Sequence, residues 1–278
     1  MATLLFVLLS LLILSVPLYF IRQRVIREID KKRFKDTPFP SEWSTLLERE
    51  YPLYNHLPQE LKDDLHYKIQ IFLAEKKFEG CNGFKITQEI KLLVAAQACT
   101  LIINRKHDVF PKLVSILIYP STYVAKSSSY DSGIITNSET SVAGQSSTWG
   151  GQITLAWNHV EGGVTNMADG DNVVFHEFAH QLDGESGDTN GVPKFDKGKN
   201  IYHPWVEIVG EEFYSFVDRV HHHHKDVIDD YGATNAAEFF AVTTETFFEK
   251  PNQLAKKHPK LYDEFKDYYQ LDPRDWFN

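Results

Sequence analysis

Two histidines four positions apart, with a glutamate directly after the first, constrain the fold of this chain more than any other feature. The motif His176-Glu177-Phe178-Ala179-His180 lies in a stretch, Val173 to Asp183, with helical spacing of apolar residues. Asp171 or Asn172 can cap its start and Gly184 can end it. Residues four apart share one helical face. The motif therefore predicts a helix whose two imidazoles reach a single metal ion.

The glutamate of the motif gives this metal site a chemical function. Glu177 projects to the side of the histidine pair, close enough to a metal-bound water to take its proton. With 12 histidines in the chain, two of them sharing a helical face by coincidence is the competing interpretation. The adjacent glutamate and the helical flanks favour a metal site. We therefore expect a zinc-dependent hydrolase with Glu177 as general base.

A catalytic zinc needs a third protein ligand, which leaves one position for water. The best candidate is Glu238, in a helix that begins after Asn235 and runs to about Phe248. A structural alternative exists, because Glu238 is three residues beyond a potential cap at Asn235 and could complete a capping box. The residue pattern alone leaves ligand and cap as equal alternatives.

Several segments together resemble one known family. They are Leu57-Pro58 through Gly80, Glu177 to Asp183, Ala237 to Val242, Phe247 to Pro251 and His258 to Tyr262. From about Phe39 to the carboxyl terminus, the chain resembles the Mlc titration factor A family of zinc peptidases. The segment Tyr231 to Ala241 also resembles the metal-ligand helix of the anthrax lethal factor protease, in which a tyrosine seven residues before the ligand glutamate assists catalysis.

The resemblance implies a gluzincin-like site and a peptidase activity. In such a site His176, His180 and Glu238 hold one Zn²⁺, Glu177 is the general base, and Tyr231 donates to the oxyanion. Members of the family are linked to aminopeptidase-type activity on peptide or protein substrates and to interaction with a glucose-responsive repressor. The main alternative to an enzyme is a regulatory protein that keeps the zinc fold and sequesters a partner. A non-peptide zinc hydrolase is a third alternative.

The amino terminus differs from the rest of the chain. Residues 2–21 carry no charge and match the length of a bilayer-spanning helix, although a cleaved signal or a buried helix would also be apolar. The soluble members of the family that the chain resembles lack such a span. We expect a membrane anchor at 1–21, a basic linker at 22–41 and a metallopeptidase domain at 42–278. Basic residues beside a span stay in the cytoplasm, so the domain should face the cytoplasm.

Charge is distributed unevenly along the chain. Seven of the 29 basic and two of the 38 acidic residues lie between Arg22 and Lys35, so the remainder carries a net charge of about −14. Such a surface repels phosphate backbones, and we expect no nucleic-acid partner. Cys81 and Cys99 make no disulfide framework and fit a reducing compartment.

The order of elements predicts an α+β, zincin-like metallopeptidase domain with an N-terminal helical layer, preceded by a single transmembrane helix. Helical spacing covers residues 42–51, 58–79 and 86–103, with Thr87 as a cap of the third helix. Strands are expected at 114–119 and 152–157, and a loop or irregular hairpin at 127–148. The strand at 152–157 is a candidate edge for pairing with an extended substrate, unless it is paired on both sides.

Four weaker signals complete the sequence-based expectations. Asp183 and Glu245 are candidates to orient the metal-binding imidazoles from behind, and each has a plain structural alternative. The run His221 to His224 favours a solvated loop over a second metal site. The loop Asp183 to Gly191 lacks the full spacing of a calcium loop and is expected to be a plain loop.

Overall fold

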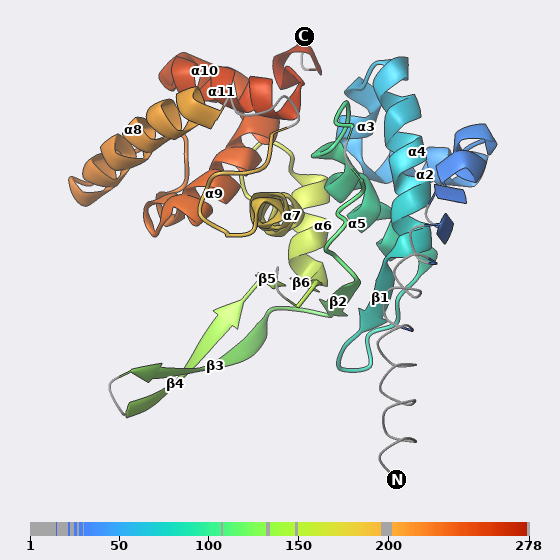
Figure 1. Cartoon of the computed structure of the whole chain (residues 1–278), viewed down its shortest axis with the longest axis horizontal. Helices are drawn as coiled ribbons and strands as arrows, with labels where there is room; N and C mark the ends of the chain where they lie inside the picture. Colours follow the sequence, from blue (N-terminus) through green and yellow to red (C-terminus); the bar gives the residue numbers. More distant parts are fainter. Residues whose placement is uncertain are drawn as a thin grey trace, which may run out of the picture. The chain divides into compact units, whose positions relative to one another are not determined.

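The computed structural model describes residues 15, 22, 25–26, 28–29, 31–106, 108–131, 134–147, 150–195 and 202–276. The chain divides into two units, Met1–Pro40 and Ser41–Asn278. The second unit contains the helices, the strands and the candidate site described below (Figure 1).

The predicted transmembrane helix, and with it the membrane-anchored localisation, is corrected by the structure. In the part of the chain that is described, no helix has both the length and the apolar character needed to cross a bilayer. The longest helix with described bounds, α8 (Tyr202–His221), carries Glu207, Glu211 and Glu212, which a span of about 20 apolar residues would not tolerate. Residues 2–21, on which the prediction rests, lie outside the described residues except for Ser15.

The second unit is α+β and begins with a layer of helices. These are α2 (Ser41–Glu50), α3 (Pro52–His56), α4 (Gln59–Glu75) and α5 (Gln88–Thr100). Helix α4 buries Leu65, Ile69 and Phe72 along one face. Thr87 caps α5 as expected, because its side chain accepts a hydrogen bond from the Ile90 amide. The helical layer thus covers one side of the core.

The helix expected at 58–79 ends earlier than its residue pattern suggests. Lys76 has an extended backbone, and β1 (Lys77–Gly80) follows it directly. The Lys77 amide donates to the Val114 carbonyl, which starts pairing with β2 (Ser115–Tyr119). Pairing with a distant strand therefore overrides the local helical preference at the end of the segment.

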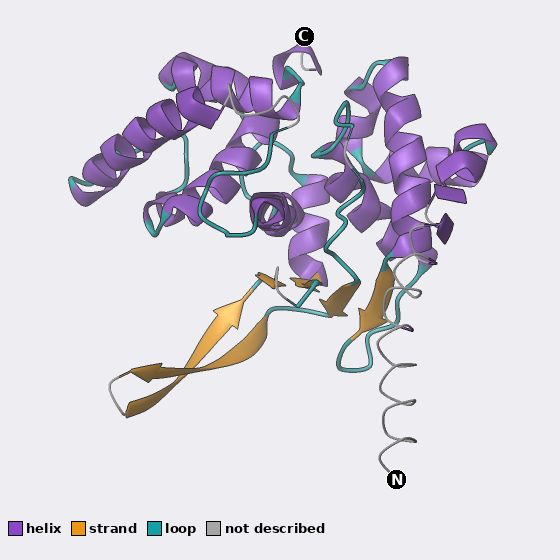
Figure 2. Cartoon of the chain, in the orientation of Figure 1, coloured by secondary structure: helices purple, strands orange, loops and turns teal. Residues whose placement is uncertain are grey.

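The main sheet has four strands in the order β1-β2-β6-β5 (Figure 2). Strands β1, β2 and β6 (Gln152–Ala156) run parallel, and β5 (Gly144–Ser147) pairs antiparallel with β6. The strand at 152–157 is therefore paired on both sides, and β5 lies at the edge. Strands β3 (Tyr123–Asp131) and β4 (Ile134–Val142) form a separate antiparallel hairpin, which begins four residues before the segment 127–148 expected to be a loop or irregular hairpin.

Beyond β6 the chain is helical again. Helix α6 (Trp157–Thr165) leads to α7 (Val173–Asp183) and the short η1 (Gly184–Ser186). After α8 come η2 (Asp230–Ala233), α9 (Ala236–Glu249), α10 (Pro251–Lys257), α11 (Pro259–Tyr269) and η3 (Pro273–Trp276). Helices α7 and α9 lie side by side and carry the candidate site (Figure 1).

Aromatic packing fixes α7 and α9 on the faces that point away from the site. On α7, Phe178 packs edge-on against Phe110 with ring centroids 4.8 Å apart. On α9, Phe240 contacts Trp205 of α8 and Phe265 of α11, at centroid distances of 5.9 and 5.6 Å. Because these large rings are almost fully buried, neither helix can rotate without losing several kcal/mol of packing, by the usual cost of about 3–5 kcal/mol per truncated aromatic.

Candidate metal centre

The N-terminus of α7 is set by Asn172. Its side-chain oxygen accepts hydrogen bonds from the amides of Val174 and Phe175, at 3.1 and 3.0 Å. Of the two residues that could have capped this helix, Asn172 is therefore the cap, and Gly184 follows the last residue as expected. The cap fixes where the helix begins, and so which residues of the motif face α9.

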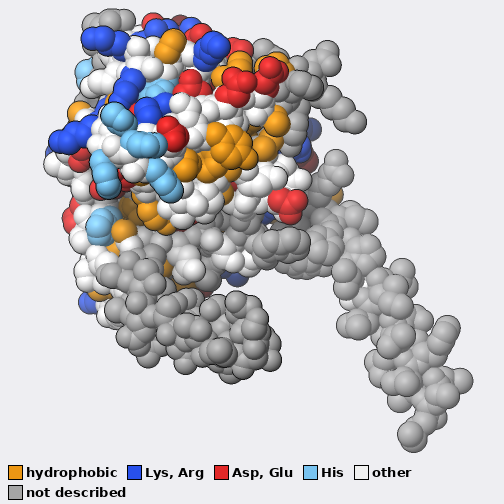
Figure 3. Space-filling model, turned by 90° about the vertical axis from the view of Figure 1, so that its left-hand side faces the viewer, with side chains coloured by type: hydrophobic (Ala, Val, Ile, Leu, Met, Phe, Trp, Pro, Cys, Tyr) orange, Lys and Arg blue, Asp and Glu red, His pale blue; other side chains and the backbone are white. Residues whose placement is uncertain are grey.

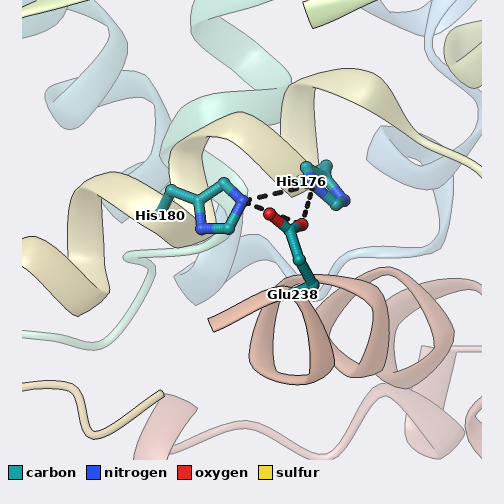
Figure 4. A group of neighbouring side chains, drawn as sticks. All are labelled: His176, His180 and Glu238. Atoms are coloured by element: carbon teal, nitrogen blue, oxygen red, sulfur yellow. Dashed lines mark hydrogen bonds and ion pairs between the residues drawn. The ribbon is translucent and has the colours of Figure 1, made fainter. Parts of the chain in front are cut away.

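Three donor atoms from α7 and α9 meet at one point (Figure 4). The Nε2 atom of His176 lies 3.0 Å from Oε2 of Glu238, and Nε2 of His180 lies 3.3 Å from the same oxygen. The two Nε2 atoms are 3.2 Å apart. In the described part of the chain, His176, His180 and Glu238 are the group of side chains with metal-ligand geometry.

These spacings fit a single tetrahedral ion. Two donors each about 2.0–2.1 Å from a tetrahedral zinc lie about 3.3 Å from one another. The three observed separations, 3.0, 3.2 and 3.3 Å, are close to that value. Two imidazole nitrogens and one carboxylate oxygen are also a donor set that zinc accepts in catalytic sites. The residues present therefore fit a zinc ion without rearrangement of the backbone.

The alternative role of Glu238 as half of a capping box is not what the side chain does. Asn235 does cap α9, accepting from the amides of Ala237 and Glu238 at 2.9 and 3.0 Å. The Glu238 carboxylate, however, lies against the two histidines. The cap and the candidate ligand are thus separate functions of neighbouring residues.

The electrostatics of the site favour a cation between the two helices. Burial alone would raise the pKa of Glu238, but its hydrogen bonds to His176 and His180 outweigh this and lower the pKa to about 2. Burial would likewise lower the pKa of His176, yet the carboxylates of Glu238 and Glu245 raise it well above its ordinary value. The carboxylates thus stabilise positive charge at this point, and the histidines stabilise the ionised form of Glu238.

Glu245 orients the first histidine from behind. Its Oε1 atom lies 2.8 Å from Nδ1 of His176, and its Oε2 accepts from the Asn172 amide at 2.5 Å. A carboxylate on Nδ1 holds the proton there and leaves Nε2 free as a lone-pair donor. The contact expected for Glu245 from its place on the helix is therefore present.

A second carboxylate on α9, which sequence reasoning did not identify, extends this contact. Glu249 accepts from the Gly170 amide at 2.9 Å and from the Asn172 side-chain nitrogen at 3.1 Å. Burial raises the pKa of Glu249 to about 8. Together, Glu245 and Glu249 attach the cap of α7 to α9, so the helix that carries Glu238 also sets the start of the helix that carries the histidines. The sequence signal was the spacing of four between the two glutamates.

The candidate base lies beside the ligands and faces a cavity. Glu177 is only 5% exposed, and no hydrogen bond to its carboxyl group is found among the described residues. Burial raises the pKa of Glu177 to about 8, and the charge on His176 opposes that rise. The cavity has a volume of about 440 Å³ and is lined by His176, Glu177 and Tyr231, among others. A buried carboxyl group without a partner is costly unless a ligand or water meets it there.

The first residue of β5 gives Glu177 the space it occupies. A Cβ atom placed on Gly144 would lie 2.6 Å from Oε1 and 2.7 Å from Cγ of Glu177. Any residue larger than glycine would therefore push the carboxyl group aside. Gly144 is a functional position that sequence reasoning missed, because one glycine in a segment rich in serine and glycine carries no distinguishing signal.

Tyr231 lies in η2 with its ring close to the metal ligands. The centroid of its ring is 6.0 Å from that of His176, and the side chain is 55% exposed. Burial, followed by the charges of Glu238 and Glu177, raises the pKa of the Tyr231 hydroxyl, which keeps it protonated as a hydrogen-bond donor. Asp229 caps η2 by accepting from the Tyr231 amide. All five residues identified from the sequence are thus brought to one place.

Comparison with known proteins identifies the family. The model of a family described as glucose-regulated metallo-peptidase M90 matches residues 26–270. This chain belongs to that family. It is 41% identical over 244 residues to uncharacterized protein slr2042 of Synechocystis sp. (strain ATCC 27184 / PCC 6803 / Kazusa), covering 87% of this chain and 88% of that protein. It is 29% identical over 237 residues to Mlc titration factor A of two Escherichia coli strains, O1:K1 / APEC and O45:K1 (strain S88 / ExPEC), covering 80% of this chain and 83% of each.

Membership of the M90 family agrees with the geometry of the site. The match at residues 26–270 includes α7, η2 and α9, and therefore every residue of the candidate centre. The family is one of metallo-peptidases, so a metal ion is implied, and His176, His180 and Glu238 are the side chains that can hold it.

Asp183 occupies a different role in this M90 chain from the one considered from its spacing. Its Oδ2 atom accepts from the Gly191 amide at 2.7 Å and so closes the loop after α7. Its Oδ1 atom and the Nδ1 atom of His180 are both buried and have no hydrogen-bond partner in the described part of the chain. Burial raises the pKa of Asp183 to about 6. Of the two roles considered for Asp183, the bond to the second histidine is therefore not formed, and the residue closes the end of the helix.

The histidine run lies apart from the candidate centre. His221 is the last residue of α8, His222 to His224 follow it, and all four are exposed. Histidine side chains gather beside lysine and arginine side chains on the face shown in Figure 3. Among the residues that the structure describes, this run is not part of a group with metal-ligand geometry.

Proposed function

We propose that this M90 chain is a zinc-dependent peptidase that hydrolyses peptide bonds with an activated water. The observation that carries the proposal is the convergence of His176, His180 and Glu238 donor atoms at tetrahedral spacing. Beside them lies the buried carboxyl group of Glu177, facing the same cavity. Ligands, base and cavity in this arrangement match what metal-assisted amide hydrolysis requires.

The residues have separate roles in the proposed reaction. His176, His180 and Glu238 hold the zinc, which when bound supplies the Lewis acidity that polarises the substrate carbonyl and acidifies water. Glu177 takes the proton from the attacking water and passes it to the leaving amine. Tyr231, protonated and near His176, donates a hydrogen bond to the oxyanion. Glu245 keeps the His176 ring in the orientation that presents Nε2.

An extended peptide has a place to bind along β5. This strand is the edge of the main sheet in the described residues, and its first residue, Gly144, lines the cavity next to Glu177. A peptide that pairs with β5 would gain main-chain hydrogen bonds and present its carbonyl to the base. We propose an aminopeptidase-like activity on such a peptide, in line with the resemblance described above.

Substitution of the base tests the peptidase proposal. Glu177→Gln should still bind one zinc, because the three ligand atoms are untouched, yet lose cleavage of peptide arylamides by about 10²–10⁴-fold, the usual contribution of a general base. Glu161→Gln, on an exposed position of α6, is the matched control and should retain wild-type activity. Equal activity of the Glu177→Gln and wild-type proteins at equal zinc content would refute the assignment.

A regulatory role is the second candidate function. Its support is the 29% identity with Mlc titration factor A, whose name says that it titrates Mlc. In this alternative the chain sequesters a transcriptional repressor and cleaves little. The same variant separates the two functions, because partner binding that survives Glu177→Gln, together with no peptide cleavage by the wild type, would favour the regulatory role.

A further inference from the structure

The cavity beside the candidate metal centre extends well past the ligands. Its walls include the loop before α7 (169–171), the start of β5, the loop that leads to η2 (226–229) and two residues of α9, Val242 and Lys250. A volume of about 440 Å³ suits a ligand of small-molecule size. Because His176 and Glu177 form part of the same walls, a group bound here would lie next to the bond that the proposed peptidase cleaves.

One carboxylate of this cavity is already neutralised by the protein. Asp226 contacts His258, Arg219 and Lys257, at 2.8, 3.0 and 3.3 Å. Burial would raise the pKa of Asp226, but its hydrogen bond to His258 and the charge of Lys257 outweigh this and lower the pKa. Asp226 therefore adds little uncompensated charge to the cavity.

Three other carboxylates of the cavity lack such partners. Asp169, Asp171 and Asp229 make no ion pair with any described residue, and Lys250 is the one ammonium in the described lining. Two of the three are held in place by backbone contacts. Asp169 accepts from the Asp171 amide, and Asp229 from the Tyr231 amide. The cavity therefore presents fixed negative charge in excess of positive charge.

A separate observation, the environment of Glu177, points to a ligand in this cavity. The Glu177 side chain is 95% buried, being only 5% exposed, lines this cavity, and has no hydrogen-bond partner among the described residues. A buried polar group without a partner costs free energy in the absence of a ligand or water. Gly144 keeps the space in front of Glu177 clear of side-chain atoms. The three aspartates thus line the same cavity as the unpartnered carboxyl group of Glu177.

We propose that this cavity binds a cationic group of the substrate, an ammonium or a guanidinium, beside the bond that is cleaved. The inference rests on the proposed peptidase function and deepens it by naming the substrate class. The cation can come from the α-ammonium of the peptide or from a lysine or arginine side chain. Asp169, Asp171 and Asp229 attract it, and Lys250 opposes it.

The test compares peptides that differ only in charge. Matched fluorogenic peptides carry lysine or norleucine at the residue before the cleaved bond, each with a free or an acetylated amino terminus. The wild type should prefer the cationic member of a pair. If the cavity recognises the side chain, the lysine peptide is cleaved faster than the norleucine peptide. If it recognises the amino terminus, the free peptide is cleaved faster than the acetylated one. Each exposed carboxylate should contribute about threefold in kcat/KM, as expected for a solvent-screened pair.

Substitutions of the cavity aspartates by asparagine remove charge but keep shape, so they test whether the preference for cationic peptides arises in the cavity. The triple variant Asp169→Asn, Asp171→Asn and Asp229→Asn should reduce the preference by up to about 30-fold, the product of three threefold effects. Lys250→Met should increase it. Asp230→Asn is the matched control, because Asp230 is the exposed neighbour of Asp229 and lies outside the cavity lining. It should leave the preference unchanged.

Two results would overturn the inference while leaving the peptidase function intact. One is equal kcat/KM for cationic and neutral members of both pairs in the wild type, and the other is an unchanged preference in the triple variant. Calorimetric binding of the same peptides to zinc-loaded Glu177→Gln protein gives a readout that needs no turnover. If no peptide is cleaved by the wild type, the peptidase proposal fails, and this binding preference still decides the inference about the cation.

Discussion

Replacement of Gly144 by alanine isolates the position of the general base from the metal site. The added Cβ would lie 2.6 and 2.7 Å from Oε1 and Cγ of Glu177 and 2.7 Å from Cγ2 of Val173, whereas real Cβ atoms essentially never approach within 3.0 Å. The carboxyl group must therefore retreat by about 0.5–1 Å to reach ordinary van der Waals contact. None of these three nearest atoms belongs to a metal ligand.

The magnitude follows from this displacement. Misplacing a catalytic group by about 1 Å costs about 10²-fold in rate, or about 2.7 kcal/mol of transition-state stabilisation. We expect Gly144→Ala to lose about 100-fold in kcat/KM on a peptide arylamide while it keeps its zinc. Overpacking should also lower the free energy of unfolding by about 1–3 kcal/mol. Initial-rate peptide assays measure kcat/KM, elemental analysis measures the zinc content, and urea unfolding measures the free energy of unfolding.

The control is another glycine of the same unit. A Cβ on Gly162, in α6, meets nothing within 4 Å, so Gly162→Ala should be fully active and slightly more stable through helix propensity. If Gly144→Ala, loaded with zinc, cleaves peptides at the wild-type rate, then Glu177 is not held in its working position by this glycine, and the reasoning is wrong.

Three further predictions concern the residues around the centre. Tyr231→Phe should lower kcat by about 10²–10³-fold with KM little changed, as for loss of one oxyanion donor, and steady-state kinetics at several substrate concentrations check this. Glu245→Gln should weaken zinc binding by about 10–100-fold, because an amide replaces the carboxylate that accepts from Nδ1 of His176. Competition with a chromogenic chelator measures the zinc affinity. Glu249 has its pKa raised to about 8 by burial, so the folded state holds a proton that the unfolded chain has lost, and wild-type stability falls as pH rises from 4.5 towards 8. Glu249→Gln lacks this titration, so the advantage of the wild type over the variant should shrink by up to about 1.4 kcal/mol per pH unit, which urea unfolding between about pH 5 and pH 8 would show.

The parts of the fold that depend on local interactions could be predicted from the sequence. Helix α7, with its cap and its glycine end, occupies the predicted range, because capping and apolar spacing act within a few residues. Helical spacing on α9 also made Glu245 a candidate to contact a metal-binding histidine, and it contacts His176. Glu238 could be identified only as one of two alternatives, because its partners lie about sixty positions away and only tertiary packing brings them together.

The features that were missed depend on distant pairing or on backbone space. The strand β1 was read as the end of a helix, because its partner β2 begins far along the chain. The strand β6 was a candidate edge, yet β5, in a segment without a strand-like pattern, covers it. Gly144 matters because its missing side chain leaves room for Glu177, and no local sequence pattern reveals that neighbour. The transmembrane prediction rested on the length and the uncharged composition of residues 2–21, and the described helices do not support it.

Metal content is the most direct test of the central claim, that α7 and α9 together hold one metal ion. Elemental analysis of freshly purified protein should find one equivalent of zinc per chain, and much less in His176→Ala and in Glu238→Ala, with both variants still folded by circular dichroism. Freshly purified wild-type protein that contains no stoichiometric transition metal, and takes up none when zinc is added back, would contradict the account.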